Sequence, residues 1–424
     1  MNETVNTHKK MEELDKMSIP YEAIPPSEWK RNAYDSNNSV SIETLRIFYK
    51  CTRDLEKVIE EQEGDEKEVE EYIINLLSLI LTQKLHLIVY HDRWLYFFNG
   101  KYFEPCPSKK ELQCILRELC EAAAYLWKRF SVHDKTVKRL LSHVQQNAVK
   151  VDYPPDISKY VVFENGVLNL DTLELEDFTP QKFFTSMIHA DWLAENKACP
   201  EYEKVINTYT NHETPLNKRI NEVLGVCLTN DMVKKLFCFL GVTNSGKTFL
   251  LSFLMRLFNN SATVTMQPND LGRQFAPSMV YGKSLCCCMD MDSAPLNTKA
   301  TAFLKGISGA DMLSAEFKGE NGSVPFQSRA HIINASNYDI TTKMPDAAFD
   351  MRKLVIPFKH RLTDNAEPFE VLMDKLEREK AAIVRKLILA YKALKDNHYE
   401  FSDSEEGESY DSYVPPTAVS RSTS

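Results

Sequence analysis

The chain has 424 residues, of which 43% are hydrophobic and 26% are charged, and its formal net charge is −9. This composition is ordinary for a globular protein, and the length predicts two or three domains. The longest apolar stretch, residues 73–81, is too short to span a bilayer and no signal peptide opens the sequence, so we expect an intracellular protein without a membrane partner. Because the overall charge gives no attraction for phosphate, a nucleic-acid binder would have to gather its basic groups on one surface.

Ten cysteines occur without a C-x-x-C pair, and three of them are consecutive, Cys286, Cys287 and Cys288. Neighbouring thiols in a buried strand fit a reducing compartment better than a disulfide framework. Paired ligands at the usual zinc spacing are missing, so we expect no zinc site.

The first part of the chain predicts a polar arm and an α+β domain. Residues 1–40 are polar and rich in proline and asparagine, so we expect a disordered arm. Residues 41–195 predict the α+β domain, with Asn99-Gly100 at a hairpin turn, helices over 106–149 and a second hairpin over 161–172. The acidic run 60–71 is either a docking surface or, as we favour, a solvated helix start. The aromatic residues of 85–103 could stack on bases and the basic residues of 135–150 could contact phosphates, but a small β core and a solvated helix face are the preferred interpretations.

The second part predicts an α/β architecture flanked by helices. Two helices are predicted over 200–235, a short helical bundle that resembles the oligomerising collar of superfamily 3 helicases, and residues 236–362 alternate strands and helices as in a parallel sheet. Residues 363–400 predict a helical region. The tail, residues 401–424, is rich in serine and acidic residues, and we expect it to be disordered.

The stretch around which this α/β domain is built is a G-x-x-x-x-G-K-T motif that follows an apolar strand and precedes an apolar helix. That context is the one a P-loop requires, and it predicts a nucleoside triphosphate site. Lys247 would reach the β- and γ-phosphates, and the Thr248 hydroxyl would ligate Mg²⁺. The predicted nucleotide-binding residues are Gly241, Val242, Thr243, Asn244, Ser245, Gly246, Lys247 and Thr248.

Polar residues follow the next predicted strands. The apolar strand 284–289 ends in Asp290 and Asp292, where a Walker B site holds Mg²⁺ and polarises the attacking water. We assign Asp290 to Mg²⁺ and Asp292 to water activation, although the two roles could be exchanged. Asn337 follows the strand 331–336 and suits a sensor of the γ-phosphate or the lytic water, whereas by itself a Ser-Asn pair is a turn. Lys318 lies in a Gly-rich hairpin tip between these strands.

In this order the motifs resemble those of superfamily 3 DNA helicases, which have an AAA+-like fold, and residues 85–192 are similar to the domain before the helicase in poxvirus- and phage-type primase-helicases. The resemblance implies a hexameric ring that uses ATP and Mg²⁺ to move 3′→5′ on single-stranded and forked DNA. It also implies that Asn337 belongs to motif C, that Lys318 and Lys305 contact DNA, and that Arg352 reaches the γ-phosphate held by a neighbouring subunit. Two departures are Ser245, which makes the loop more like those of papillomavirus and parvovirus helicases, and Asp in place of Glu in Walker B.

The function expected from this resemblance is DNA unwinding in the genome replication of a virus, phage or mobile element, in the cytoplasm or nucleus of a host cell. Residues 1–80 are too short and polar for a primase catalytic domain, so a primase and a DNA polymerase would be other chains. Two alternatives remain, an ATP-driven DNA packaging translocase and an ATP-binding replication scaffold. Strand displacement from a forked substrate discriminates all three.

Overall fold

The computed structural model describes residues 52, 55–84, 86–90, 94–105, 109–127, 130–151, 157–291, 293–318, 322–363 and 367–415, so the predicted arm, residues 1–40, lies outside the described residues. The described residues form two compact units. The first ends at residue 155 and takes in residues 178–185, and the second holds residues 156–177 and those from 186 onwards. The division thus falls before the second hairpin, and not near residue 195 as expected, because Val161, Phe163 and Leu168 of that hairpin are buried with the helices of the second unit.

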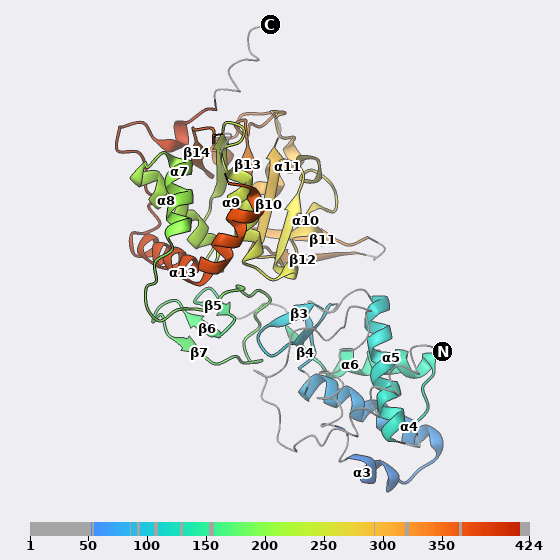
Figure 1. The fold of residues 1–424 in the computed structure, drawn as a ribbon. Coiled ribbons are helices and arrows are strands. Elements are labelled where there is room, and N and C mark those ends of the chain that lie inside the picture. Colours follow the sequence, from blue (N-terminus) through green and yellow to red (C-terminus); the bar gives the residue numbers. More distant parts are fainter. Residues whose placement is uncertain are drawn as a thin grey trace. The chain divides into compact units, whose positions relative to one another are not determined.

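The first unit combines a helical cluster with a small sheet (Figure 1). Its elements are α3 (Glu56–Glu60), α4 (Glu66–Leu79), the π-helix η3 (Ile80–Lys84), β1 (Ile88–Tyr90), β2 (Trp94–Phe98), β3 (Phe103–Pro105), α5 (Lys109–Leu126), α6 (Asp134–Asn147) and β4 (Val149–Val151). The sheet order is β3-β2-β1-β4, with β4 parallel to β1 and the other pairs antiparallel.

Local sequence explains several of these elements. Asp65 caps α4 by accepting the N–H groups of Lys67 and Glu68, and the Glu68 carboxylate accepts the Asp65 N–H in return, which forms a capping box. The acidic run is therefore a helix start, as favoured. Asn99 and Gly100 make the turn between β2 and β3, with Gly100 at φ +96°. The aromatic side chains of Tyr96, Phe98, Phe103 and Phe183 are buried against one another, so the preferred β core is confirmed for these residues.

The second unit holds an antiparallel sheet of β5 (Tyr160–Phe163), β6 (Gly166–Asn169) and β7 (Leu175–Glu176), together with a five-stranded parallel sheet. Its further elements are α7 (Pro200–Thr210), α8 (Thr214–Cys227), β8 (Leu236–Gly241), α9 (Lys247–Arg256), η4 (Asn260–Ala262), β9 (Thr263–Met266), η5 (Pro268–Asp270), α10 (Ala276–Val280), β10 (Leu285–Met291), α11 (Thr298–Ser308), β11 (Met312–Glu316), β12 (Ser323–Gln327), β13 (His331–Ser336), α12 (Ala347–Asp350), β14 (Lys353–Phe358), α13 (Phe369–Asp396) and η6 (Tyr410–Ser412). None of the helices in the described ranges is both long and apolar enough to cross a membrane.

The parallel sheet has the order β14-β8-β13-β10-β9, and every neighbouring pair is parallel. Both faces of the sheet are covered, as parallel sheets require. Phe237, Phe239 and Cys287 belong to the core shared with α7, α8, α9 and α13, whereas Cys286 and Cys288 belong to the core shared with α10 and α11. The three consecutive cysteines are therefore buried on alternate faces of one strand, as the period of two dictates.

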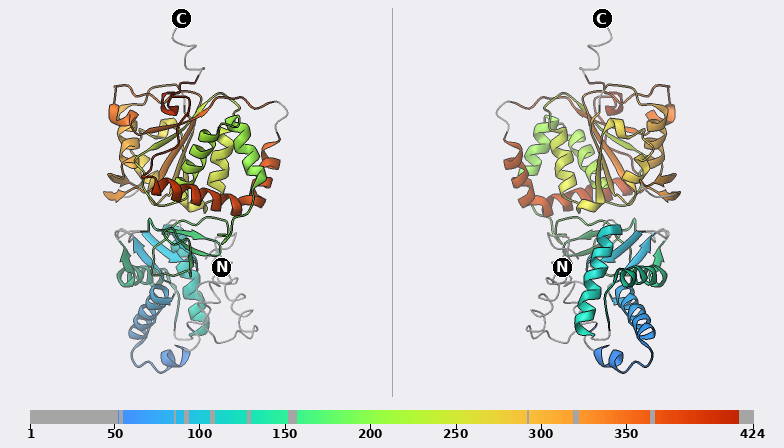
Figure 2. Two further views of the ribbon diagram at one scale, coloured as in Figure 1. Left: turned by 90° about the vertical axis from the view of Figure 1, so that its left-hand side faces the viewer. Right: turned by 90° about the vertical axis from the view of Figure 1, so that its right-hand side faces the viewer.

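The helices beside the sheet are held together by close backbone contacts. A Cβ atom at Gly225 of α8 would lie 2.2 Å from the carbonyl oxygen of Leu387 in α13, so only glycine allows the two helices to approach this closely. Figure 2 shows α13 lying across the pair formed by α7 and α8. These two helices confirm the expected helical pair over 200–235, and α13 confirms the helical region after 363.

The expectation of a disordered tail is wrong for residues 402–415. These residues fold back on the second unit and end in η6 and the buried Pro415. The reason is specific pairing: Tyr410 is 2% exposed, and acidic side chains of the segment neutralise the buried Arg219. Composition alone could not reveal a buried cation that matches the acidic tail.

Candidate functional site

The glycine-rich loop 241–248 joins the end of β8 to the start of α9. Gly241, Asn244 and Gly246 have φ angles of +155°, +57° and +93°, a region that glycine and asparagine adopt more readily than other residues. A Cβ atom at Gly241 would lie 2.0 Å from the Phe358 carbonyl oxygen, and one at Gly246 would lie 2.3 Å from the Tyr209 ring. Both glycines are therefore required by close approach as well as by backbone conformation.

Lys247 begins α9 and is 7% exposed. Its ammonium donates hydrogen bonds to the carbonyl oxygens of Gly241 (3.0 Å) and Val242 (2.6 Å) and to Ser245 Oγ (3.1 Å). It also donates to Asn337 Oδ1 at 3.0 Å, although 90 residues separate the two. The side chain thus ties the loop after β8 to the residue after β13.

The contact between Lys247 and Asn337 follows from the order of the strands in the sheet. Strands β8 and β13 are neighbours, but the chain leaves β8 for the β9 edge and leaves β13 for the opposite edge at β14. In open parallel sheets, a crevice opens at the carboxyl ends of two strands whose connections leave in opposite directions, and ligands bind there. Lys247 and Asn337 lie at this switch point.

The acidic residues at the carboxyl end of β10 are only partly described, and the strand runs past Asp290 to Met291. Asp290 lies within β10, which is paired with β13, but its side chain is not among those described, and Asp292 lies outside the described residues. The Ser336 hydroxyl donates to the carbonyl oxygen of Met291 at 2.9 Å and joins the ends of the two strands. Within the described ranges, no cluster of three or more His, Cys, Asp or Glu side chains could hold a metal ion.

A cavity of about 790 Å³ opens above the loop. Thr243, Thr248 and Asn337 supply polar groups to its lining, and Thr243 and Thr248 are exposed. The opposite wall comes from α7 and the start of α13, where the apolar Val205, Tyr209, Phe369 and Leu372 line the cavity together with Thr208 and the Lys204–Glu367 ion pair. Sequence reasoning missed this wall, since no local motif marks residues so far from the loop.

Tyr209 connects this wall with the loop. It is 4% exposed, and burial raises the pKa of its phenol above the usual range. Its ring meets Phe249 of α9 edge-on at 6.3 Å between centroids and lies 6.5 Å from the Phe358 ring. The ring is therefore a fixed support beneath Gly246.

Arg352 lies at the other edge of the sheet. It immediately precedes β14, where Lys353 is paired with Leu236 at the first position of β8. The six residues of β8 separate this end from the loop by about 20 Å. Arg352 donates to the Ala348 carbonyl oxygen at 2.7 Å, and its buried Nε has no partner within the described part of the chain. It therefore cannot reach the cavity of its own chain.

The hairpin expected between the strands 284–289 and 331–336 consists of β11 and β12, which pair antiparallel. Lys318 follows β11 and is exposed, while residues 319–321 at the tip lie outside the described residues. Beside it, a cavity of about 500 Å³ is lined by Phe275, Phe317 and Lys318 among others, and Phe275 is 40% exposed. Phe275 is therefore a candidate for a DNA contact beside Lys318, and sequence reasoning missed it.

Lys305 and two residues of the basic stretch 135–150, Arg139 and His143, contact carboxylates. Lys305 in α11 contacts Asp346 at 2.5 Å and lowers the pKa of that carboxyl. In the first unit Arg139 pairs with Glu70 and Glu71 of α4, and His143 lies 2.9 Å from Glu71. These contacts support the preferred solvated-face interpretation for Arg139 and His143, and they weaken the case for Lys305 as a DNA contact.

Comparison with known proteins adds two family matches. Residues 78–211 match the family model described as D5 N terminal like, and residues 239–352 match a family of unknown function (DUF5906). Domains of these two kinds are typical of phage and viral primase-helicases. The two matches are therefore to domains found in the same kind of protein. No curated protein sequence matches it.

Two solved structures are similar to this chain at low sequence identity. The apo structure of the NrS-1 C terminal region (305-718) is 12% identical, with a TM-score of 0.50 over 78% of this chain and 76% of that one. The A form apo structure of the NrS-1 C terminal region is 14% identical, with a TM-score of 0.48 over 77% and 74% of the two chains. The similarity to the (305-718) structure, with its TM-score of 0.50, concerns the fold and nothing beyond it.

Proposed function

We propose that this protein is a superfamily 3 DNA helicase of a P-loop, AAA+-like fold that hydrolyses ATP to unwind duplex DNA in replication. The observation that carries the proposal is the hydrogen bond between Lys247 and Asn337 at the switch point of the parallel sheet, beside a cavity of nucleotide size. The two matches to primase-helicase-type domains support the role in replication.

The loop suits a phosphate chain, because the positive φ angles of Gly241 and Gly246 let it wrap tightly at the N-terminus of α9, beside the cavity. In the proposal Lys247 binds the β- and γ-phosphates, and the wall with Tyr209 and Phe369 receives the base. Thr248 and Asp290 would hold Mg²⁺, which neutralises charge on the phosphate oxygens when it is bound. Asn337 orients the attacking water, and Asp292 is the proposed group that polarises it.

A ring of subunits completes the site in this proposal. Arg352 lies about 20 Å from the loop of its own chain, so any contact it makes with a γ-phosphate is with that of a neighbour. Such an arginine offsets transition-state charge and accelerates phosphoryl transfer by about 10³-fold or more. The hexameric state follows from the resemblance to superfamily 3.

DNA is proposed to contact the β11–β12 hairpin. Lys318 would bind a backbone phosphate and the exposed Phe275 ring would stack on a base, the two kinds of contact by which proteins track a single strand. Lys305 is a weaker candidate because Asp346 already pairs with it.

The test is strand displacement on forked DNA with 3′ and 5′ tails in turn, using the full chain, ATP and Mg²⁺. We expect unwinding with the 3′ tail and none by Lys247→Ala. ATP binding without hydrolysis and without displacement on either fork would favour the replication scaffold. Movement on blunt duplex DNA without strand separation would favour the packaging translocase.

A further inference from the structure

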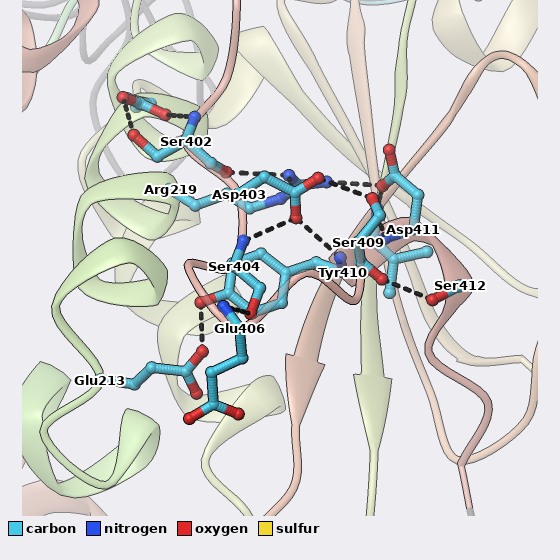
Figure 3. Close-up of polar contacts among 12 residues, drawn as sticks. Glu213, Arg219, Ser402, Asp403, Ser404, Glu406, Ser409, Tyr410, Asp411 and Ser412 are labelled. Carbon is cyan, nitrogen blue, oxygen red and sulfur yellow. Dashed lines mark hydrogen bonds and ion pairs between the residues drawn. The ribbon is translucent and has the colours of Figure 1, made fainter.

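The acidic C-terminal segment, residues 402–415, is bound to the second unit by a network of charged side chains (Figure 3). Its first residue, Ser402, donates its N–H and its hydroxyl to the two carboxylate oxygens of Glu222, both at 2.8 Å. Near its end, the hydroxyl of the buried Tyr410 donates to Glu213. Both carboxylates belong to the α8 region, so the segment is attached to this helix at two points.

Arg219 of α8 is the centre of the network. Its side chain is 2% exposed and contacts Asp411 at 2.5 Å and Asp403 at 3.7 Å. It also donates to the Ser402 carbonyl oxygen at 2.9 Å. The centroid of the Tyr410 ring lies 5.3 Å from the Arg219 guanidinium and 5.5 Å from the Lys359 ammonium. A buried guanidinium thus depends on two aspartates of the tail for its counter-charge.

The segment also covers the edge of the parallel sheet. Asp411 Oδ1 accepts the N–H of Val355 at 2.9 Å, which satisfies a donor on the outer edge of β14. The same strand begins after Arg352 and leads to Leu362, whose N–H donates to the carbonyl oxygen of Asn244 in the glycine-rich loop at 2.8 Å. The tail is therefore attached to the strand that runs from Arg352 toward the glycine-rich loop.

Ser409 joins the two aspartates that bind Arg219. Its hydroxyl donates to Asp403 Oδ2 at 2.6 Å and accepts the Asp411 N–H at 3.3 Å, so it caps the short helix η6. The residue is exposed, and Glu405, Glu406 and Glu408 precede it in the sequence. It is thus an accessible hydroxyl in an acidic segment, in direct contact with the groups that hold the segment down.

We propose that Ser409 is a phosphorylation site and that its modification releases residues 402–415 from α8 and β14. A kinase that prefers serines flanked by acidic residues would transfer the γ-phosphoryl group of ATP to Ser409 Oγ. The bond from phosphorus to the leaving oxygen of ADP breaks, a phosphate ester forms, and the hydroxyl proton passes to the base of the kinase.

Electrostatic repulsion explains why phosphorylation would release the segment. Phosphorylation removes the donor that bonds Asp403 and places about two negative charges beside that carboxylate. The nearby cations already have partners: Arg219 is shared by Asp403 and Asp411, Lys359 pairs with Glu213, and Lys218 pairs with Glu222. The phosphate can gain a cation only by competing with a carboxylate that already belongs to the network, which is Asp403 or Asp411 at Arg219, Glu213 at Lys359 and Glu222 at Lys218.

The experiment installs phosphoserine at position 409 of the full chain and measures hydrogen exchange at the Val355 amide, which Asp411 protects. We expect exchange there to accelerate by roughly tenfold or more, with protease cleavage appearing in residues 402–415. Exchange at Ile333 in the central strand should stay unchanged, which separates release of the segment from unfolding. An acidophilic kinase with Mg²⁺-ATP should label the unmodified chain at Ser409 and fail to label this position in Ser409→Ala.

Two variants separate charge from the lost hydrogen bond. Ser409→Ala removes the hydroxyl without adding charge, and Ser412→Glu adds charge at the far end of η6; both should exchange more slowly at Val355 than the phosphoprotein. Adding Asp403→Asn to the phosphoprotein should restore protection, because the repelling carboxylate is gone. Unchanged or slower exchange at Val355 in the phosphoprotein, or no labelling of Ser409, would overturn the proposal. None of these readouts requires helicase activity, so the proposal can fail independently of the proposed function.

Discussion

The contact between Gly246 and Tyr209 makes a quantitative prediction about the glycine-rich loop. Replacing Gly246 by alanine places a Cβ atom 2.3 Å from the Tyr209 ring, at a backbone φ of +93°. The ring cannot turn away freely, since it is 4% exposed and packed against Phe249 and Phe358. Backbone and side-chain effects therefore act together at this position.

The two effects have separate magnitudes. A non-glycine residue in the left-handed region costs about 1–2 kcal/mol. Forcing an extra carbon into a packed site costs about 1–3 kcal/mol. Gly246→Ala should therefore lower the free energy of unfolding of the second unit by about 2–5 kcal/mol and weaken binding of an ATP analogue, because the loop must shift.

A double-mutant cycle with Tyr209→Leu tests this reasoning. Leucine removes the ring atoms in conflict but leaves the backbone strain, so the double variant should be more stable than additivity predicts by about 1–3 kcal/mol. Native-state hydrogen exchange at the Phe239 amide in β8 reports the free energy of this unit. Gly241→Ala is the matched control, because its Cβ would lie 2.0 Å from the backbone oxygen of Phe358, which no side-chain change can remove. Additive effects of Gly246→Ala and Tyr209→Leu would refute the steric argument.

Three further predictions concern DNA, the ring and pH. Lys318→Ala should keep DNA-independent ATP hydrolysis but lose strand displacement, both measured on one preparation. Lys247→Ala and Arg352→Ala should each lose ATP hydrolysis, by about 10³-fold or more for Arg352, and their mixture should recover part of it because some interfaces pair two intact residues. Burial lowers the pKa of His331 to about 4 in the folded chain, whereas the unfolded chain has the ordinary histidine pKa of about 6.5. Between these two pH values the unfolded chain binds a proton that the folded chain does not bind. The free energy of unfolding should therefore fall by about 3 kcal/mol as the pH drops from about 6.5 to about 4.

Each of these predictions has a contrary outcome. If Lys318→Ala unwinds DNA at the rate of the original protein, other residues bind the DNA strand. Mixed rings that assemble at several ratios but show no recovery would make Arg352 a structural residue. For His331, the difference in unfolding free energy between the original protein and His331→Gln should shrink below pH 6.5, and a constant difference would contradict the buried neutral imidazole.

Much of the secondary structure follows from sequence patterns that act over a few residues. The Asn99-Gly100 turn and the Asp65–Glu68 capping box depend on local backbone geometry. Alternation along β10 assigns Cys286 and Cys287 to opposite faces, and the two core clusters confirm this. The strand-loop-helix order around Lys247 is also found as expected. In all of these cases the deciding contacts lie within one turn or one strand.

Local patterns therefore predict most of the elements and the residues at their ends, including the loop from Gly241 and the polar position at Asn337. Which distant residues contact them depends on tertiary packing. Tyr209 supports Gly246 from another helix, Lys247 meets Asn337 across 90 residues, and Arg219 binds Asp411 across 192. These contacts depend on how whole helices and strands pack. An acidic, serine-rich tail has the composition of a disordered segment until a buried arginine supplies its counter-charge.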